Sequence, residues 1–147
     1  MKIKILCLGR LNKDEENELC KRYKDRLKSL KNSGITDFSI EQISKKTLEN
    51  IIKNKKKKKI IFLSENGQDL NTENFCKTLK KLINSSIKET LFIIGEPTGF
   101  KNSLNKENFE EICLSKLTFT HSLARVLLTE QIYRCATIMI NHPYHRK

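Results

Sequence analysis

Short apolar runs alternate with amphipathic segments along this chain, and that alternation constrains the possible folds more than any other feature of the sequence. The runs occupy residues 3–8, 60–63 and 91–94, and their β-branched content is typical of buried strands. Residues 38–43 alternate near a period of two, which predicts a half-buried strand. Because helical segments separate these strands, we expect an α/β domain with a mainly parallel sheet.

Apolar side chains recur at helical spacing between the predicted strands. Within residues 14–30, the residues Leu19, Tyr23, Leu27 and Leu30 follow one another at helical intervals and predict a helix. Further helices are predicted around residues 48–52, over residues 71–83 with Asn71 and Thr72 as caps, around residues 106–112, and over residues 123–140. Residues 117–120 predict a short extended piece. The length of 147 residues suits a single domain spanning residues 1–147.

Three loops are expected to form one candidate site. Residues 65–68 predict a turn that ends the second apolar run, with Gly67 at positive φ, and the glycines of residues 95–99 allow a ligand to approach the backbone. Ligands of open α/β sheets bind beyond the carboxyl ends of the strands, so these loops and the stretch after Phe119 should converge. The sequence contains neither G-x-G-x-x-G nor a P-loop, which disfavours a doubly wound nucleotide-binding enzyme.

The chain carries a large positive charge. Lys and Arg total 29 against 17 Asp and Glu, and the formal net charge is +12. A polyanion such as RNA or DNA is therefore a natural partner. The abundance of Lys, Asn and Ile is also the pattern expected from an AT-rich genome, so codon bias is an alternative explanation. Both explanations stay open for the lysine run at residues 55–59.

The cysteines are odd in number and widely spaced, and none forms a C-x-x-C pair; they are Cys7, Cys20, Cys76, Cys113 and Cys135. This usage indicates a reducing setting, and we expect the cysteines to be small buried residues. The apolar start of the chain meets Gly9 before a signal sequence is complete, and no apolar run approaches the length of a membrane span. The expectation is a cytoplasmic protein with no membrane partner.

All the histidines fall near the carboxyl terminus together with a group of cationic and aromatic residues. The histidines are His121, His142 and His145, and their neighbours include Arg125, Tyr133, Arg134, Tyr144 and Arg146. No Asp, Glu or Cys accompanies the histidines at a regular ligand spacing, so we expect no metal site. The alternation of aromatic and cationic groups beside Pro143 suits stacking on bases and binding of phosphate.

Three motifs resemble those of a known family. They are Ile93-Ile94-Gly95-x-Pro97-x-Gly99, the segment Leu117-Thr118-x-x-His121-x-Leu123-x-Arg125-Val126-Leu127-x-x-Glu130-Gln131-Ile132-Tyr133-Arg134, and the terminal Asn141-His142-Pro143-Tyr144-His145-Arg146. The whole chain resembles the small bacterial SPOUT methyltransferases that methylate N3 of a pseudouridine in large-subunit ribosomal RNA. Glu96 stands where that family usually has a second glycine, and Lys147 stands where an acidic residue is common.

The resemblance implies a SPOUT-type α/β fold, a parallel sheet with helices on both faces and a C-terminal trefoil knot, an exception to the rule that chains are un-knotted. It implies a homodimer that methylates 23S rRNA of the large subunit in assembled ribosomes, with S-adenosylmethionine as methyl donor and no metal. The tail of one subunit would complete the site of the other.

The resemblance also implies roles for individual residues. The cofactor would lie against Leu63, Gly95, Glu96, Gly99, Ser115, Lys116, Leu117, Thr118, Phe119 and Thr120. The catalytic residues would be Arg134, Tyr144, His145 and Arg146, and the RNA-binding residues His121, Arg125 and His142. The alternative is a non-catalytic rRNA-binding or ribosome-assembly factor on the same fold, which applies if Glu96 blocks the cofactor.

Overall fold

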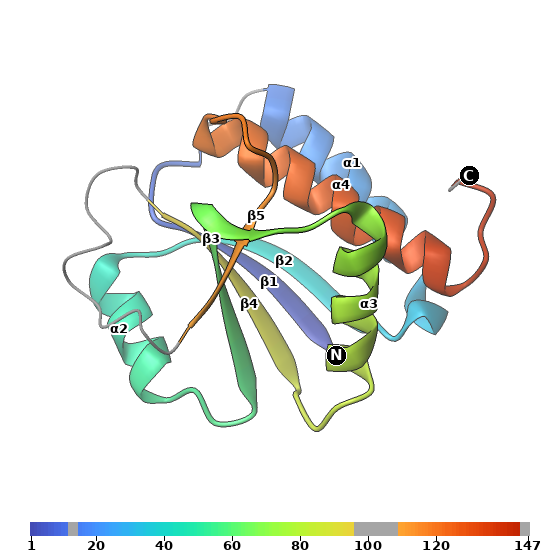
Figure 1. The fold of residues 1–147 in the computed structure, drawn as a ribbon, viewed down its shortest axis with the longest axis horizontal. Helices are drawn as coiled ribbons and strands as arrows, with labels where there is room; N and C mark the ends of the chain where they lie inside the picture. Colours follow the sequence, from blue (N-terminus) through green and yellow to red (C-terminus); the bar gives the residue numbers. More distant parts are fainter. Residues whose placement is uncertain (12–14, 96–108, 145–147) are drawn as a thin grey trace.

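Five parallel strands form the centre of the computed structural model, which describes residues 1–11, 15–95 and 109–144 (Figure 1). The strands are β1 (Lys2–Cys7), β2 (Asp37–Gln42), β3 (Lys58–Asp69), β4 (Glu89–Ile94) and β5 (Glu110–Cys113). Their order across the sheet is β2-β1-β4-β3-β5, and every neighbouring pair is parallel. The predicted α/β fold with a parallel sheet is confirmed.

Helices cover both faces of the sheet. They are α1 (Glu15–Leu27), α2 (Lys45–Lys53), α3 (Thr72–Ile83) and α4 (His121–Met139), and a short 3-10 helix, η1 (Lys31–Ser33), follows α1. On one face, α4 packs between α1 and α3, whereas α2 lies on the opposite face (Figure 1). Parallel strands must be joined by crossover connections, which are usually helices, and such helices cover the faces of the sheet.

The alternating directions of strand side chains divide the core into two layers. Ile3 and Ile5 of β1 pack toward α1, α3 and α4, whereas Leu6 and Leu8 pack toward Leu48 of α2. At the other end of the α2 face, charged side chains take the place of apolar ones. Lys4 Nζ lies 3.0 Å from Glu41 Oε1 and 3.9 Å from Glu89 Oε1, and Lys58 Nζ lies 3.7 Å from Glu89 Oε2. This row of ion pairs crosses four strands where α2 does not cover the sheet.

Side-chain caps determine where two of the helices begin. Asn71 Oδ1 accepts a hydrogen bond of 2.8 Å from the backbone N–H of Asn74, which confirms Asn71 as the N-cap of α3. Thr120 Oγ1 accepts a bond of 3.3 Å from the N–H of Leu123, and α4 therefore begins at His121, two residues before the predicted start.

The predicted end of the second apolar strand is wrong. β3 continues to Asp69, and an irregularity between Leu63 and Gln68 brings both of these residues opposite Ile112 of β5. Gly67 does not have the positive φ that the predicted turn requires. A Cβ atom on Gly67 would instead lie only 2.6 Å from the carbonyl carbon of Ile112, so the glycine permits close approach to the β5 backbone.

The predicted helix over residues 106–112 is also wrong where the structure describes it. Residues 110–113 form β5 at the edge of the sheet, and residues 106–108 lie outside the described residues. Pairing with β3 and burial of Ile112 and Cys113 outweigh the local helical pattern. Residues 117–120 belong to the connection from β5 to α4 and join no strand.

Candidate functional site

The start of α4 lies beside the carboxyl end of β1, whose neighbours in the sheet are the end of β4 and, beyond it, Leu63 of β3. Leu63 lies opposite Ile94, and Ile94 lies opposite Cys7, so the residues that follow these strands share one edge of the sheet. A Cβ atom on Gly9 would lie 3.8 Å from Nδ1 of His121, which places the first residue of α4 beside the end of β1. The structure therefore brings together Leu63, Gly95 and His121, as the position of strand ends predicts.

The loop from β5 to α4 borders this edge and contains six of the expected cofactor-binding residues. Its backbone is held locally, because Ser115 Oγ accepts a hydrogen bond of 3.0 Å from the Leu117 N–H and Cys113 Sγ donates to the Ser115 carbonyl at 2.7 Å. The side chains of Lys116, Leu117 and Thr118 are exposed. This loop belongs to neither the sheet nor a helix, so no strand pairing occupies its backbone groups.

A second cluster lies near the end of α4. Arg134 Nη2 donates to Glu130 Oε1 at 2.6 Å, and the Tyr144 hydroxyl donates to the same oxygen at 3.1 Å. The Arg134 guanidinium carbon lies 5.1 Å from the centre of the Tyr144 ring, within the range of a cation–π contact. Tyr133 packs edge-on against Tyr144 at 4.8 Å between ring centres. These contacts hold Tyr144 against α4.

Hydrogen bonding and burial in this cluster hold Arg134 and Tyr144 each in one protonation state. The hydrogen bond to Glu130 raises the pKa of Arg134 above its usual value. Burial raises the pKa of Tyr144, and hydrogen bonding with Tyr23 and the negative charge of Glu130 add to that increase. At neutral pH, Arg134 is therefore a cation and Tyr144 is a neutral hydroxyl that donates a hydrogen bond.

Glu130 is the residue of this cluster whose role the sequence analysis missed. Besides Arg134 and Tyr144, Gln131 Nε2 donates to its second oxygen at 2.7 Å, and Thr72 Oγ1 of α3 donates to Gln131 at 2.9 Å. The available signal was the spacing of Glu130 and Arg134, four residues apart in a predicted helix, which places their side chains on one face.

The two regions lie at opposite ends of α4. Arg134 lies thirteen positions after His121, and at a rise of about 1.5 Å per residue the two are roughly 20 Å apart along the helix axis. Figure 1 shows the start of α4 above β5 and its end near the carboxyl terminus. One chain therefore does not bring Arg134 and Tyr144 to its own loop between β5 and α4.

The remaining candidate residues differ in exposure. His142 is exposed, and its Nδ1 accepts a hydrogen bond of 3.2 Å from the Tyr144 N–H, whereas His121 is half-buried. Arg125 is only 2% exposed, which argues against the expected direct contact with RNA, because α4 buries this position against the sheet. Glu96, Gly99, His145 and Arg146 lie outside the described residues.

The lysine run at residues 55–59 has partners within the protein. Lys55 Nζ lies 5.3 Å from the centre of the Phe109 ring, and Lys59 Nζ lies 2.8 Å from Glu110 Oε2. Lys58 pairs with Glu89, as described above, and Lys56 and Lys57 are exposed. Much of this run therefore stabilises the strands around β3.

All five cysteines are free and buried, which confirms the prediction made from their spacing. Burial raises the pKa of the Cys7 thiol to about 11, and it also raises the pKa values of Cys76 and Cys135. A thiol with a raised pKa stays protonated at neutral pH and is a poor nucleophile.

Within residues 1–11, 15–95 and 109–144, no three His, Cys, Asp or Glu side chains are placed to share a metal ion. Among the helices of the same ranges, none is long and apolar enough to span a membrane.

Comparisons with known proteins find similar proteins over nearly the whole length of the chain. A family profile described as "Predicted SPOUT methyltransferase" matches residues 1–145. A protein of Christiangramia forsetii named "Ribosomal RNA large subunit methyltransferase H" is 35% identical over 100% of both chains. A protein of the same name from Caldicellulosiruptor bescii is 36% identical, over 98% of this chain and 99% of its own. A crystal structure assigned to an RNA methyltransferase of Bacillus anthracis has a similar fold, with a TM-score of 0.51 and 13% identity over 100% of this chain and 99% of that one.

Proposed function

Because the chain belongs to the SPOUT methyltransferase family, we propose that it transfers a methyl group from S-adenosylmethionine to 23S rRNA of the large ribosomal subunit. The full-length similarity to proteins named "Ribosomal RNA large subunit methyltransferase H" carries this proposal. The nucleotide that the family resemblance implies is a pseudouridine, methylated at N3. The substrate is the assembled ribosome in the cytoplasm.

The loop between β5 and α4 suits the proposed cofactor. S-adenosylmethionine supplies a methyl group that its sulfonium already activates, so the main task of the protein is to position the reactants. Gly95 and residues 115–120 would hold the cofactor largely through backbone groups, beside Leu63 of β3. The exposed side chain of Leu117 offers apolar surface next to those polar groups, a combination typical of small-molecule sites.

The side chains at the end of α4 suit the target base. N3 of pseudouridine is a weak acid that must lose its proton before it can accept a methyl group, so a fixed cation that stabilises the anion lowers the barrier. Arg134 is such a cation, because Glu130 orients its guanidinium. The Tyr144 hydroxyl donates a hydrogen bond to the same carboxylate and so lies beside this cation. Arg146 would orient the base and stabilise its anion together with Arg134, and His145 and Tyr144 would stack on or hydrogen-bond the flipped nucleotide.

We propose that the protein is a homodimer in which the tail of one chain completes the site of the other. The separation of roughly 20 Å between His121 and Arg134 supports a composite site. The start of α4 and the loop before it also expose three large apolar side chains, Leu117 (71%), Leu123 (45%) and Leu127 (38%). An apolar patch of this kind is typical of a protein interface. The proposed C-terminal trefoil knot rests on membership of the family.

The test is transfer of labelled methyl from S-adenosylmethionine to ribosomes that lack the modification, followed by mass mapping of the labelled nucleotide. We expect label on N3 of one pseudouridine. Arg134→Ala should lower the transfer rate by about 100-fold or more, because a charge that stabilises the transition state is lost. Its affinity for S-adenosylmethionine should be nearly unchanged.

Two outcomes would contradict this proposal. If Arg134→Ala lost cofactor affinity and transfer to the same extent, Arg134 would belong to the cofactor site instead. If the wild-type protein bound ribosomes but transferred no label, it would be a non-catalytic ribosome-binding factor on the same fold.

A further inference from the structure

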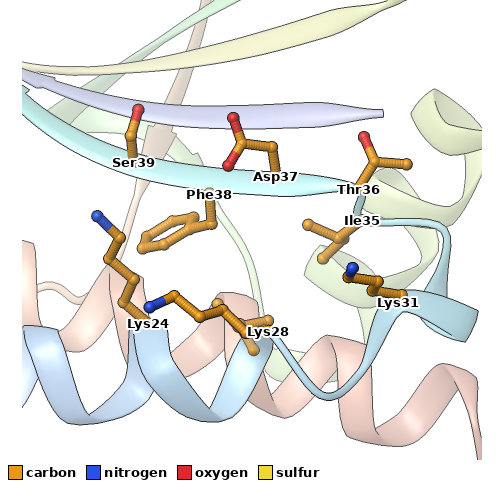
Figure 2. A pocket seen from close by; sticks show the side chains of 9 residues that line it. Lys24, Lys28, Lys31, Ile35, Thr36, Asp37, Phe38 and Ser39 are labelled. Atoms are coloured by element: carbon orange, nitrogen blue, oxygen red, sulfur yellow. The ribbon is translucent and has the colours of Figure 1, made fainter.

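A groove of about 340 Å³ lies between α1 and β2, away from the site described above (Figure 2). Leu27, Ile35 and Phe38 line its floor and are each at most 6% exposed. The groove begins beside the first residues of β2, at the amino end of the strand. The candidate cofactor loops lie at the carboxyl ends, so this groove is a separate surface.

Three lysines line the groove on its helical side. Lys24 lies in the last turn of α1, Lys28 follows directly after that helix, and Lys31 is the first residue of η1. All three line the same groove. Figure 2 shows the Lys24 and Lys28 ammonium groups extending between α1 and β2. The apolar stems of the lysines cover the floor, which leaves the charged ends at the mouth of the groove.

The nearby carboxylates offset this charge only in part. Lys28 Nζ donates a hydrogen bond of 2.7 Å to Asp25 Oδ1, so Asp25 neutralises one of the three ammonium groups. Asp37 lines the groove, but Figure 2 shows its carboxylate directed away from α1, on the far side of β2. The mouth of the groove is therefore positively charged.

The opposite wall of the groove is the edge of the sheet. Among the described strands, β2 pairs with β1 alone, so its outer edge presents backbone N–H groups that no described strand uses. Backbone N–H groups at a sheet edge can donate hydrogen bonds to an anion. Ammonium groups on one wall and N–H groups on the other make this groove complementary to a chain of phosphates.

We propose that the groove between α1 and β2 binds the phosphate backbone of the rRNA substrate, at a distance from the methylated nucleotide. The identity of that RNA rests on the proposed function. Phosphate contacts of this kind position a protein on RNA without reading its sequence. An acidic peptide added to the edge of β2 is the competing occupant, and the net charge of +12 favours RNA.

The test compares two triple variants of equal charge. One is Lys24→Ala, Lys28→Ala and Lys31→Ala, and the control is Lys77→Ala, Lys80→Ala and Lys81→Ala, which removes three exposed lysines of α3. Affinity for large ribosomal subunits is measured at several salt concentrations. The groove variant should bind about 10-fold more weakly than wild type at low salt, and its slope of log affinity against log salt should be smaller by about 2. The α3 variant should differ little from wild type.

Equal losses in both variants would overturn the inference, because net charge alone would then explain them. A second measurement uses a poly-glutamate peptide. If the groove variant lost affinity for the peptide but kept that for the subunits, the groove would bind peptide and the inference would be wrong. A different result would show that the proposed function is wrong while the groove inference holds. In that case the wild-type protein would transfer no methyl group, but the groove variant would still lose affinity for the subunits. Unfolding free energy is measured in each case to confirm that the variants fold.

Discussion

Glu130 connects more of the candidate catalytic residues than any other described side chain of α4. It accepts hydrogen bonds from Arg134, Gln131 and Tyr144, and its own side chain is 15% exposed. A carboxylate in this position fixes the direction of the Arg134 guanidinium and holds Tyr144 against the helix. Glu130 acts through Arg134, so we regard it as a positioning residue.

Replacing Glu130 with Gln should show whether the carboxylate of Glu130 is needed to orient the Arg134 guanidinium. Glu130→Gln keeps the size of the side chain but removes the ion pair, so we expect kcat for methyl transfer to fall by about 10-fold or more while KM and cofactor affinity change little. The free energy of unfolding should fall by only about 1 kcal/mol. Glu73→Gln is the matched control, because it breaks the ion pair of 2.9 Å between Glu73 and Lys77 on α3. Equal kcat values in the two variants would show that Glu130 does not position Arg134.

At the scale of elements, the contact between β3 and β5 depends on one residue without a side chain. Gly67 lies where β3 resumes its pairing after the irregularity that follows Leu63. The backbone atoms of Glu111 and Ile112 lie within 2.7 Å of the position of a Cβ atom on Gly67. Because β5 leads directly into the loop before α4, this packing also supports the candidate cofactor site.

Gly67→Ala should therefore destabilise the protein. We expect the free energy of unfolding to fall by about 2 kcal/mol, because the added methyl group must displace the β5 backbone. Urea denaturation measures this change. Gly9→Ala is the control, since its Cβ atom would make an ordinary contact of 3.8 Å with His121. A loss in Gly67→Ala no larger than that in Gly9→Ala would contradict the close approach as the reason for the glycine.

At the scale of the whole molecule, α4 joins the edge of the sheet to the terminal cluster. Its first turns carry Leu123 and Leu127, which face solvent in the single chain, and its last turns carry Arg134. A homodimer that buries the first turns would explain both the exposed leucines and the distance between the two parts of the candidate site. The basic groove beside α1 would give this assembly a further contact with RNA.

Charge placed on the exposed face of α4 should prevent association. We expect the double variant Leu123→Glu and Leu127→Glu to raise the dimer dissociation constant by about 100-fold, because carboxylates would be buried at the interface. Sedimentation at several protein concentrations measures the association, and methyl transfer should fall with it. Asn50→Glu, at an exposed position of α2, is the control. A variant that stayed dimeric would place the interface elsewhere.

The sequence by itself determined much of the fold, because periodicity and caps are local properties. The apolar runs located β1 and β4, the helical spacing located α1, α3 and α4, and Asn71 marked the start of α3. The conclusion that the cysteines are buried was also available from composition and spacing.

Only the tertiary structure decided which distant residues meet. A residue's neighbours along the chain do not show that β3 pairs with residues 110–113, that Gly67 lies against Ile112, or that Arg125 is buried. The cluster around Glu130 likewise requires that the chain after α4 fold back along it, so that Tyr144 reaches a carboxylate fourteen positions earlier. Pairing and burial between segments far apart in sequence are properties of the packed chain, and they outweigh local preference wherever the two conflict.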